Sequence, residues 1–353
     1  MFDYLIIGSG LAGMAMAETL QSRGHRICVF DDSSRQASLV AAGLYNPVVL
    51  KRLNLTWEGG RLMDFSIPFY QRLQEKLGGS FDEKLPILRR FASAEEQNAW
   101  FEAADRPGLS RFLSPRLLRN DNPGLDAPFG FGEVLETGRL HTAKLLTAYR
   151  SLLHRQGALR AESFDHGSLR LYGEEVAYGD IKSRYVVFCE GFGMRANPFF
   201  RYLPLQGSKG ELLTVRIPGL GEGRIIKSGV FLIPEGNDRY RVGATYGRND
   251  FSPEPTPAAR EELTRKLGHI LKVDFEVENQ SAGIRPTVPD RRPLAGRHPE
   301  HPRLLALNGM GSRGVLLAPY AAACLADFVE SGTPLPPEID LARYGKFYGK
   351  SPG

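Results

Sequence analysis

The sequence predicts an α/β protein that joins a Rossmann-like domain to a second, α+β domain built on a large antiparallel sheet. Three observations lead to this prediction. An apolar run at residues 4–7 enters a Gly-x-Gly-x-x-Gly turn, and a helical pattern follows the turn. A second strand, glycine loop and helix occur near the other end, at residues 304–330. Between them, residues 205–247 alternate β-rich segments with turns, as antiparallel sheets do.

The first turn has the glycine spacing of a dinucleotide-binding loop. Gly8 makes the tight turn, Gly10 lets a pyrophosphate approach the backbone, and Gly13 lets the helix pack closely on the strand. Leu11 and Ala12 belong to the same loop, where unpaired N–H groups and the helix dipole attract phosphate. The alternative reading is an ordinary glycine-rich βα turn without a ligand.

A second strand, residues 25–30, ends at Asp31, about twenty residues after the glycines. A carboxylate at this place accepts a hydrogen bond from a ribose hydroxyl. Asp32 is the alternative for the same role, because either acid could instead cap the next turn. All parts follow in order within one βαβ unit, so the sequence predicts a dinucleotide site at this end of the chain.

Composition narrows the class of protein. The chain has 353 residues, of which 42% are hydrophobic and 24% charged, as in globular enzymes with two domains. The net charge of +5 permits an anionic substrate or an RNA partner but requires neither. We expect no membrane association, since no apolar run has the length of a span. The first apolar run is too short for a signal peptide, which predicts a cytoplasmic protein.

The cysteines and histidines predict no metal site. Cys28, Cys189 and Cys324 are far apart in the sequence, and we expect each to be a buried thiol. His298 and His301 share a segment that prolines hold extended, which favours a solvated turn over a pair of ligands.

The remaining elements alternate between the two predicted domains. Helical patterns occur at residues 56–77, 93–104, 140–155 and 257–271, strand-like runs at 86–91, 159–164, 169–171 and 181–189, and a hairpin-like run at 130–138. The run at 181–189 ends at Gly191, which suits a return to the first sheet. The predicted first domain comprises residues 1–45, 140–203 and 281–353, and the second comprises 46–139 and 204–280.

The second glycine loop offers another set of backbone donors. Residues 283–294 are rigid and basic, and a short apolar strand then leads into the loop. The loop precedes a helix and can donate to an anion or to an electron-rich ring edge. We assign five cofactor contacts to it: Gly311, Ser312, Arg313, Gly314 and Val315.

Taken together, these motifs resemble the family of FAD-dependent amine oxidoreductases that includes D-amino acid oxidase, glycine oxidase and sarcosine oxidase. The resemblance covers nearly the whole chain and rests on the order of the motifs: the first loop with Asp31, residues 38–43, the strand at 242–245, Gly283-Ile284-Arg285-Pro286, and the second loop. It implies a domain of the GR2/DAO type with noncovalent FAD. It also implies further cofactor contacts from Ser38, Ala42, Gly43 and Gly191.

The resemblance also implies a reaction and a substrate site. A hydride passes from the carbon beside an amine to flavin N5, and water hydrolyses the resulting imine, with oxygen or an unknown carrier as electron acceptor. Arg285 matches the family arginine that holds the substrate carboxylate, unless an internal acid such as Asp290 pairs with it. Tyr246 and Tyr45 are candidates for hydroxyl contacts, with core packing as the alternative for either.

Two departures and one further likeness leave the substrate open. Phe231 stands where glycine oxidase-like sequences carry a tyrosine, and the turn at residues 205–211 differs from the family's Gly-Gln type. The run from Gly243 to Tyr246, followed by Arg248, is closest to the oxidase domain of enzymes that remodel methylaminomethyl groups on tRNA. Besides oxidation of a small amine or amino acid, the sequence therefore allows oxidation of a carboxymethylaminomethyl group on tRNA, or a non-catalytic flavoprotein.

Overall fold

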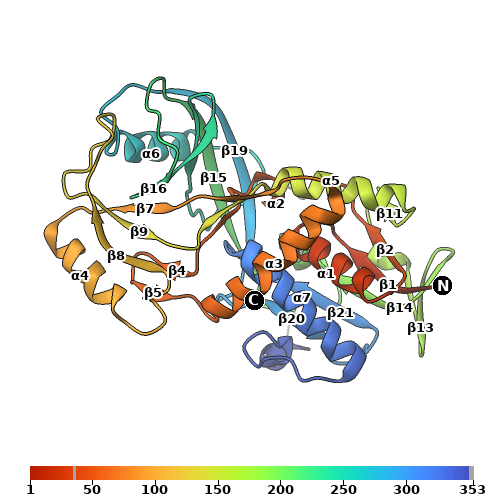
Figure 1. The fold of residues 1–353 in the computed structure, drawn as a ribbon. Coiled ribbons are helices and arrows are strands. Elements are labelled where there is room, and N and C mark those ends of the chain that lie inside the picture. Colours follow the sequence, from red (N-terminus) through yellow and green to blue (C-terminus); the bar gives the residue numbers. More distant parts are fainter. Residues whose placement is uncertain (35–36, 350–353) are drawn as a thin grey trace.

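The computed structural model describes residues 1–34 and 37–349 and contains two large sheets (Figure 1). The strands of the first sheet run parallel in the order β11, β2, β1, β14 and β21. Its antiparallel additions are β20, beside β21, and the β12–β13 hairpin, beside β14. The strand bounds are β1 (Phe2–Ile7), β2 (Ile27–Phe30), β11 (Leu159–Arg160), β12 (Leu169–Tyr172), β13 (Glu175–Tyr178), β14 (Ile181–Phe188), β20 (Leu294–Arg297) and β21 (Leu304–Asn308).

The first strand is apolar from Tyr4 to Ile7 because both faces of its sheet are covered. Tyr4 and Ile6 belong to the core shared with the helices on one face. Leu5 and Ile7 belong to a separate core on the opposite face. Burial on both faces is the reason that a central parallel strand shows a continuous apolar run instead of alternation.

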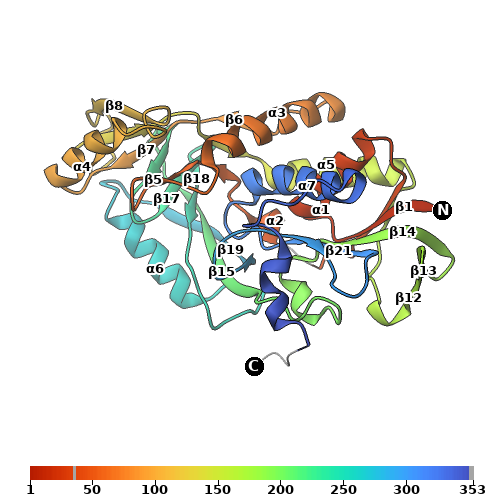
Figure 2. The same cartoon turned by 90° about the horizontal axis from the view of Figure 1, so that it is seen from below.

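Three helices cover one face of the first sheet: α1 (Leu11–Ser22), α5 (Thr142–Arg155) and α7 (Gly314–Ser331) (Figure 2). Pro319 inside α7 removes the N–H that would bond the carbonyl of Val315. Tyr70 of α3 (Gly59–Leu77) donates to that carbonyl instead, at 2.9 Å. Ser66 of α3 donates to the next carbonyl, that of Leu316. Helix α3 thereby ties residues of the predicted second domain to the first sheet.

Among the described residues, α7 is the one helix long and apolar enough to cross a membrane by length and composition, with a mean hydropathy of 1.3. Most of this helix, 61%, is buried inside the protein, where it packs against α1 and α3. A buried core helix explains its composition. The location of the protein in the cell stays a prediction.

The second sheet has the strand order β19, β15, β18, β17, β16, β7, β9 and β8, and all its neighbours are antiparallel except β16 and β7. Helix α6 (Pro257–Gly268) covers one face, where Leu263 and Leu267 pack into the core of that face. Helix α4 (Ala94–Ala104) lies beside β8. The strand bounds are β7 (Ile87–Arg90), β8 (Leu113–Leu118), β9 (Phe131–Val134), β15 (Gln206–Arg216), β16 (Ile225–Lys227), β17 (Phe231–Gly236), β18 (Arg239–Gly243) and β19 (Glu276–Thr287).

Short elements connect the two sheets. A three-stranded sheet consists of β3 (Leu44–Tyr45), β10 (Gly138–Leu140) and β6 (Asp82–Lys84), and a two-stranded one of β4 (Val48–Val49) and β5 (Asn54–Leu55). Helix α2 (Ala37–Val40) lies against β19. The described residues also contain three 3₁₀ helices: η1 (His166–Ser168), η2 (Gly191–Ala196) and η3 (Leu341–Phe347).

The structure corrects the predicted hairpin at residues 130–138. Its two strands, β9 and β10, fall in different sheets, because the turn between them carries the chain from one sheet to the other. Thr137 fixes the crossing by donating from its hydroxyl to the carbonyl of Leu85. Residues 283–294, the rigid and basic segment, begin inside β19. This strand stays in the second sheet through Thr287, so it crosses the predicted domain boundary at residue 281.

Candidate active site

The first glycine loop has the close packing that its spacing predicts. Gly8 has a φ of +99°, a region that suits glycine. A Cβ atom at Gly13 would lie 1.8 Å from the carbonyl oxygen of Gly8, and one at Gly8 would lie 2.6 Å from that of Cys189. The loop therefore packs against itself and against the end of β14, and side chains at these two positions would break the turn.

The N-terminus of α1 leaves backbone donors open. Gly10 is its N-cap and provides no side chain to cap the first turn. The N–H of Leu11 donates to Ser38 Oγ at 3.2 Å, which places the predicted Ser38 against the loop. Ala12 and Gly13 occupy the next two positions, whose N–H groups have no partner within a helix. These N–H groups are the donors available to a pyrophosphate.

Of the two candidate acids, Asp31 is the one that contacts the loop. Its carboxylate accepts from the N–H of Ser9 at 2.5 Å and from that of Ser33 at 2.7 Å. Arg150 of α5 donates to the same carboxylate and, at 2.9 Å, to Ser9 Oγ. Asp32 instead accepts from Ser34 N and Ser163 Oγ.

Sequence reasoning missed Arg150, because an arginine in an amphipathic helix carries no signal for a loop 119 residues away. This side chain also lines a surface pocket of about 390 Å³ on α5.

The second glycine loop lies beside both the first loop and β19. Gly311 N–H donates to the carbonyl of Pro286 at 2.8 Å. A Cβ atom at Gly314 would lie 3.2 Å from Leu11, so α7 begins against the start of α1. No side chain caps α7, which leaves the N–H groups of Gly314 and Val315 without helix partners. Ser312 is exposed.

The other predicted cofactor contacts occupy two places. Gly191 follows β14, and its carbonyl accepts from Asn308 at the end of β21, so both lie at the carboxyl edge of the parallel strands. Gly43 packs against the backbone of Leu140, whose N–H donates to the Gly43 carbonyl at 2.9 Å. Ala42, next to it, is half-buried.

Arg285 lies on β19, and its guanidinium contacts an aromatic ring and a glycine. Its guanidinium carbon is 4.6 Å from the centre of the Tyr246 ring, and Nη1 donates to the carbonyl of Thr245 at 3.2 Å. A Cβ atom at Gly210 would lie 2.0 Å from Nη2, so the guanidinium rests on bare backbone. No carboxylate pairs with Arg285 within residues 1–34 and 37–349, and Asp290 pairs with Arg343 instead.

The two tyrosines have different environments. Tyr246 is 66% exposed and covers Arg285 with its ring. Tyr45 is only 2% exposed, and its hydroxyl donates to Asp82 at 2.6 Å while accepting from Lys84 at 2.9 Å. Both hydrogen-bonding directions of the Tyr45 hydroxyl are thus used inside the small sheet, so we withdraw Tyr45 as a substrate contact.

Phe231 lies on β17 opposite Lys227 of β16 and Gly243 of β18. The ammonium of Lys227 is 4.5 Å from the centre of the phenyl ring and donates to the carbonyl of Ser228 at 2.7 Å. Burial is the main cause that lowers the pKa of Lys227, to about 8, and the nearby Arg89 and Lys266 act in the same direction.

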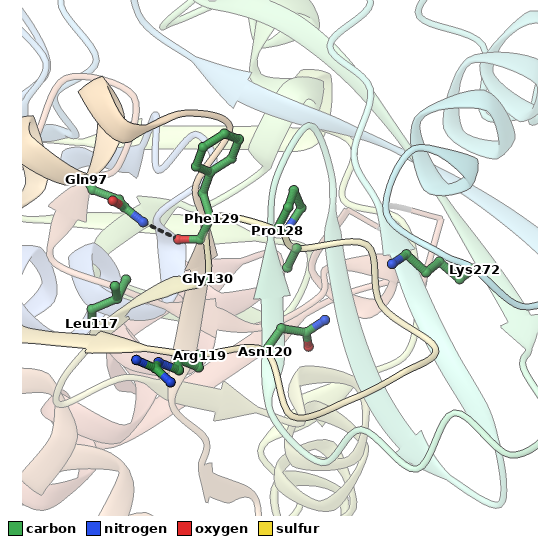
Figure 3. Close-up of a pocket in the computed structure, with 9 residues that line it drawn as sticks. Gln97, Leu117, Arg119, Asn120, Pro128, Phe129, Gly130 and Lys272 are labelled. Atoms are coloured by element: carbon green, nitrogen blue, oxygen red, sulfur yellow. Dashed lines mark hydrogen bonds between the residues drawn. The ribbon is translucent and has the colours of Figure 1, made fainter.

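One surface pocket lies far from the candidate substrate arginine, Arg285. It has a volume of about 420 Å³ and lies around Phe129 and Arg119, where Gln97 donates to the carbonyl of Phe129 (Figure 3). These residues adjoin β8 and β9 at one edge of the second sheet, whereas Arg285 lies on β19 at the opposite edge. The described residues contain no cluster of three or more His, Cys, Asp or Glu that could hold a metal.

Comparison with known proteins agrees with this geometry. Residues 3–328 match the FAD dependent oxidoreductase (DAO) family. The chain belongs to this family. A glycine oxidase of Bacillus licheniformis is 33% identical over 357 residues, which are 93% of each chain. A second relative is the tRNA 5-methylaminomethyl-2-thiouridine biosynthesis bifunctional protein MnmC of Burkholderia mallei (strain SAVP1). It is 24% identical over 392 residues, which cover 96% of this chain and 58% of that protein.

Solved structures share the fold. The glycine oxidase of Bacillus cereus ATCC 14579 superposes with a TM-score of 0.77 at 24% identity, covering 95% of this chain and 96% of its own. The iminodiacetate oxidase of Chelativorans sp. BNC1 gives a TM-score of 0.78 at 20% identity, covering 97% and 98%. The α/β fold of the DAO type is therefore confirmed.

The protein is an FAD-dependent oxidoreductase, and the residues present fit the cofactor. A Cβ atom at Gly8 or Gly13 would collide with backbone oxygens, so only glycine fits at these two positions of the loop. The open N–H groups at the start of α1 suit the pyrophosphate, and Asp31 has the place of a ribose acceptor. The loop before α7 offers further donors for the flavin ring.

Proposed function

We propose that this oxidoreductase oxidises the C–N bond of a small or N-substituted amino acid whose carboxylate binds Arg285. The observation that carries the proposal is a half-buried guanidinium without a carboxylate partner in the described part of the chain. A guanidinium has five N–H donors, and a single bond, to the carbonyl of Thr245, uses one of them. Burial lowers the pKa of Arg285, and Tyr246 counteracts this effect.

The arrangement favours a planar anion as the missing partner. An arginine fork can bind both oxygens of a carboxylate and fix its orientation, which an ammonium cannot do. Tyr246 and Gly210 hold the fork from two sides, so little side-chain entropy remains to be lost when the anion binds. The site thus supplies orientation, the main protein contribution that such a reaction needs.

When bound, FAD supplies the acceptor for a hydride from the carbon beside the nitrogen. The substrate also loses a proton from nitrogen, and the resulting imine reacts with water to give an oxo acid and either ammonia or, from an N-substituted substrate, an amine. Arg285 holds the carboxylate next to the reacting carbon throughout. The two electrons pass finally to oxygen or to a carrier.

The test is anaerobic reduction of the purified yellow protein by D- and L-amino acids and N-alkyl glycines. We expect at least one of these to bleach the flavin, and no bleaching by any of them would contradict the proposal. Arg285→Met should keep its flavin and raise the KM at least about tenfold, since a charge-assisted fork is lost. Arg216→Met, at the exposed far end of β15, is the matched control.

A second candidate function is oxidation of a carboxymethylaminomethyl group on tRNA. The similarity to MnmC favours it, as does the exposed ring of Tyr246. The arginines that follow residue 294 give less support, because Arg303 pairs with Glu174 and Arg297 covers Phe328. Binding of modified tRNA that weakens steeply with salt would favour this function, whereas weak, salt-insensitive binding would argue against it.

A further inference from the structure

A second arginine without a carboxylate partner among the described residues lies on the loop that adjoins β19. Arg313 stands at the N-cap of α7 and donates to the carbonyl of Asn46 at 2.7 Å. The bond from Gly311 N to the carbonyl of Pro286 places this loop directly against the residue that follows Arg285. Arg285 of β19 and Arg313 of the loop therefore belong to two segments that lie side by side.

The acids around these two arginines are engaged elsewhere. Asp290 pairs with Arg343 at 2.9 Å. Asp250 pairs with Lys209 at 2.5 Å. Glu211 accepts from Thr256 and Gln280 on the other face of β15. Throughout the part of the chain that the structure describes, no carboxylate lies within ion-pair distance of Arg285 or Arg313, and Arg291 adds a further positive charge that acts on Arg313.

We infer that the substrate is an amine with two carboxylates, one held by Arg285 and the other by Arg313. This inference rests on the proposed function, because it concerns the same site. A simple amino acid brings one negative charge and leaves one arginine unpaired. A dicarboxylate satisfies both, and unpaired charges in a partly desolvated region are costly.

Tyr246 supports the pairing of the two arginines in one site. The Tyr246 ring lies 4.6 Å from the guanidinium carbon of Arg285. Tyr246 also acts to raise the pKa of both Arg285 and Arg313. Burial lowers the pKa of each more strongly than Tyr246 raises it.

The first experiment compares substrates that differ by one carboxylate. N-Carboxymethylglycine and N-methylglycine share the reacting carbon and nitrogen, and aspartate and alanine form a second pair. We expect kcat/KM to be higher for the dicarboxylate by about tenfold or more, the size of one charge-assisted contact. Equal values, or a preference for the monocarboxylate, would overturn the inference while leaving the proposed function intact. Failure of all four to reduce the flavin would instead overturn both.

The second experiment assigns the additional carboxylate to Arg313. In Arg313→Met, kcat/KM for the dicarboxylate should fall about tenfold more than that for the monocarboxylate, so the preference should vanish, whereas Arg285→Met should weaken both kinds of substrate. If Arg313 acts on the flavin ring instead, its variant would slow all substrates equally, which contradicts the inference. Arg216→Met again serves as the control.

A binding measurement gives a readout independent of turnover. Malonate and acetate are not oxidisable amines, and calorimetry on the flavin-loaded protein measures their dissociation constants. We expect malonate to bind at least about tenfold more tightly than acetate in the unaltered protein. In Arg313→Met the two should bind alike. A wild-type malonate affinity in this variant would sink the assignment.

Discussion

Arg150 of α5 donates a hydrogen bond to the carboxylate of Asp31 across 119 residues of sequence. The same nitrogen donates to Ser9 Oγ within the first glycine loop, at 2.9 Å. A cation therefore fixes the predicted ribose acceptor against the loop predicted to hold the pyrophosphate. One Asp31 oxygen also receives the N–H of Ser9, so the carboxylate is held from both sides.

This relationship predicts a selective loss of cofactor affinity. Arg150→Met should weaken FAD binding to the flavin-free protein by about tenfold, since a charge-assisted contact that orients Asp31 disappears. FMN lacks the adenosine half, so its affinity should not change. Quenching of flavin fluorescence measures both dissociation constants. Arg155→Met, exposed on the same helix, is the control, and an equal loss of FAD and FMN would show that Arg150 does not act on the adenosine end.

Gly13→Ala should abolish flavin binding. The added Cβ atom would lie 1.8 Å from the carbonyl oxygen of Gly8. Neither the loop nor the helix can move away from this contact without opening the turn. The comparison variant is Gly173→Ala, because no atom lies within 4 Å of a Cβ atom there. The flavin absorbance of the purified proteins measures the effect. A yellow Gly13→Ala protein with full flavin content would refute the tight packing that we describe.

Lys209 holds the loop that carries Tyr246. Its ammonium is buried and donates to Asp250 at 2.5 Å and to Ser252 at 2.9 Å, and its backbone pairs with Gly247. Lys209→Met should release the loop and raise the KM several-fold with little change in kcat. Lys272→Met, a surface lysine near α6, should leave both constants unchanged. A lowered kcat at unchanged KM would contradict this positioning role.

The buried Lys227 predicts a rise of stability with pH. Its pKa falls from 10.5 in the unfolded chain to about 8 in the folded protein. Below pH 8 both states bind the proton, and the folded state carries the full cost of the buried charge, about 3 kcal/mol. Between pH 8 and 10.5 only the unfolded chain stays protonated, so the free energy of unfolding should increase with pH.

Denaturant unfolding of the unaltered protein and Lys227→Met over this pH range checks the sign. The variant should be more stable near pH 7 by up to about 3 kcal/mol, and the difference should shrink as the pH rises to 10. A difference that grows with pH would contradict the buried ammonium.

The sequence predicted the two glycine loops because each depends on local order, whereas the role of Arg285 is implied by the resemblance to the family and stays a prediction. Gly8, Gly10 and Gly13 lie within six residues, and their turn forms wherever a strand precedes and a helix follows. The pairing of β9 with β7 instead of with β10 could not be read in this way, because it is settled by contacts between distant segments. The withdrawal of Tyr45 likewise depends on Asp82, 37 residues later.

The sequence by itself predicted a dinucleotide-binding fold, since periodicity and glycine spacing express the local geometry of a strand, a turn and a helix. The resemblance of its ordered motifs to a known family implied FAD, which the family match confirms. Only the tertiary structure decided which charges stand together. It paired Asp31 with Arg150 and Asp290 with Arg343, and it left Arg285 and Arg313 without carboxylates among the described residues. The physical reason is that ion pairing depends on distance in space, which the sequence separation of two residues does not give.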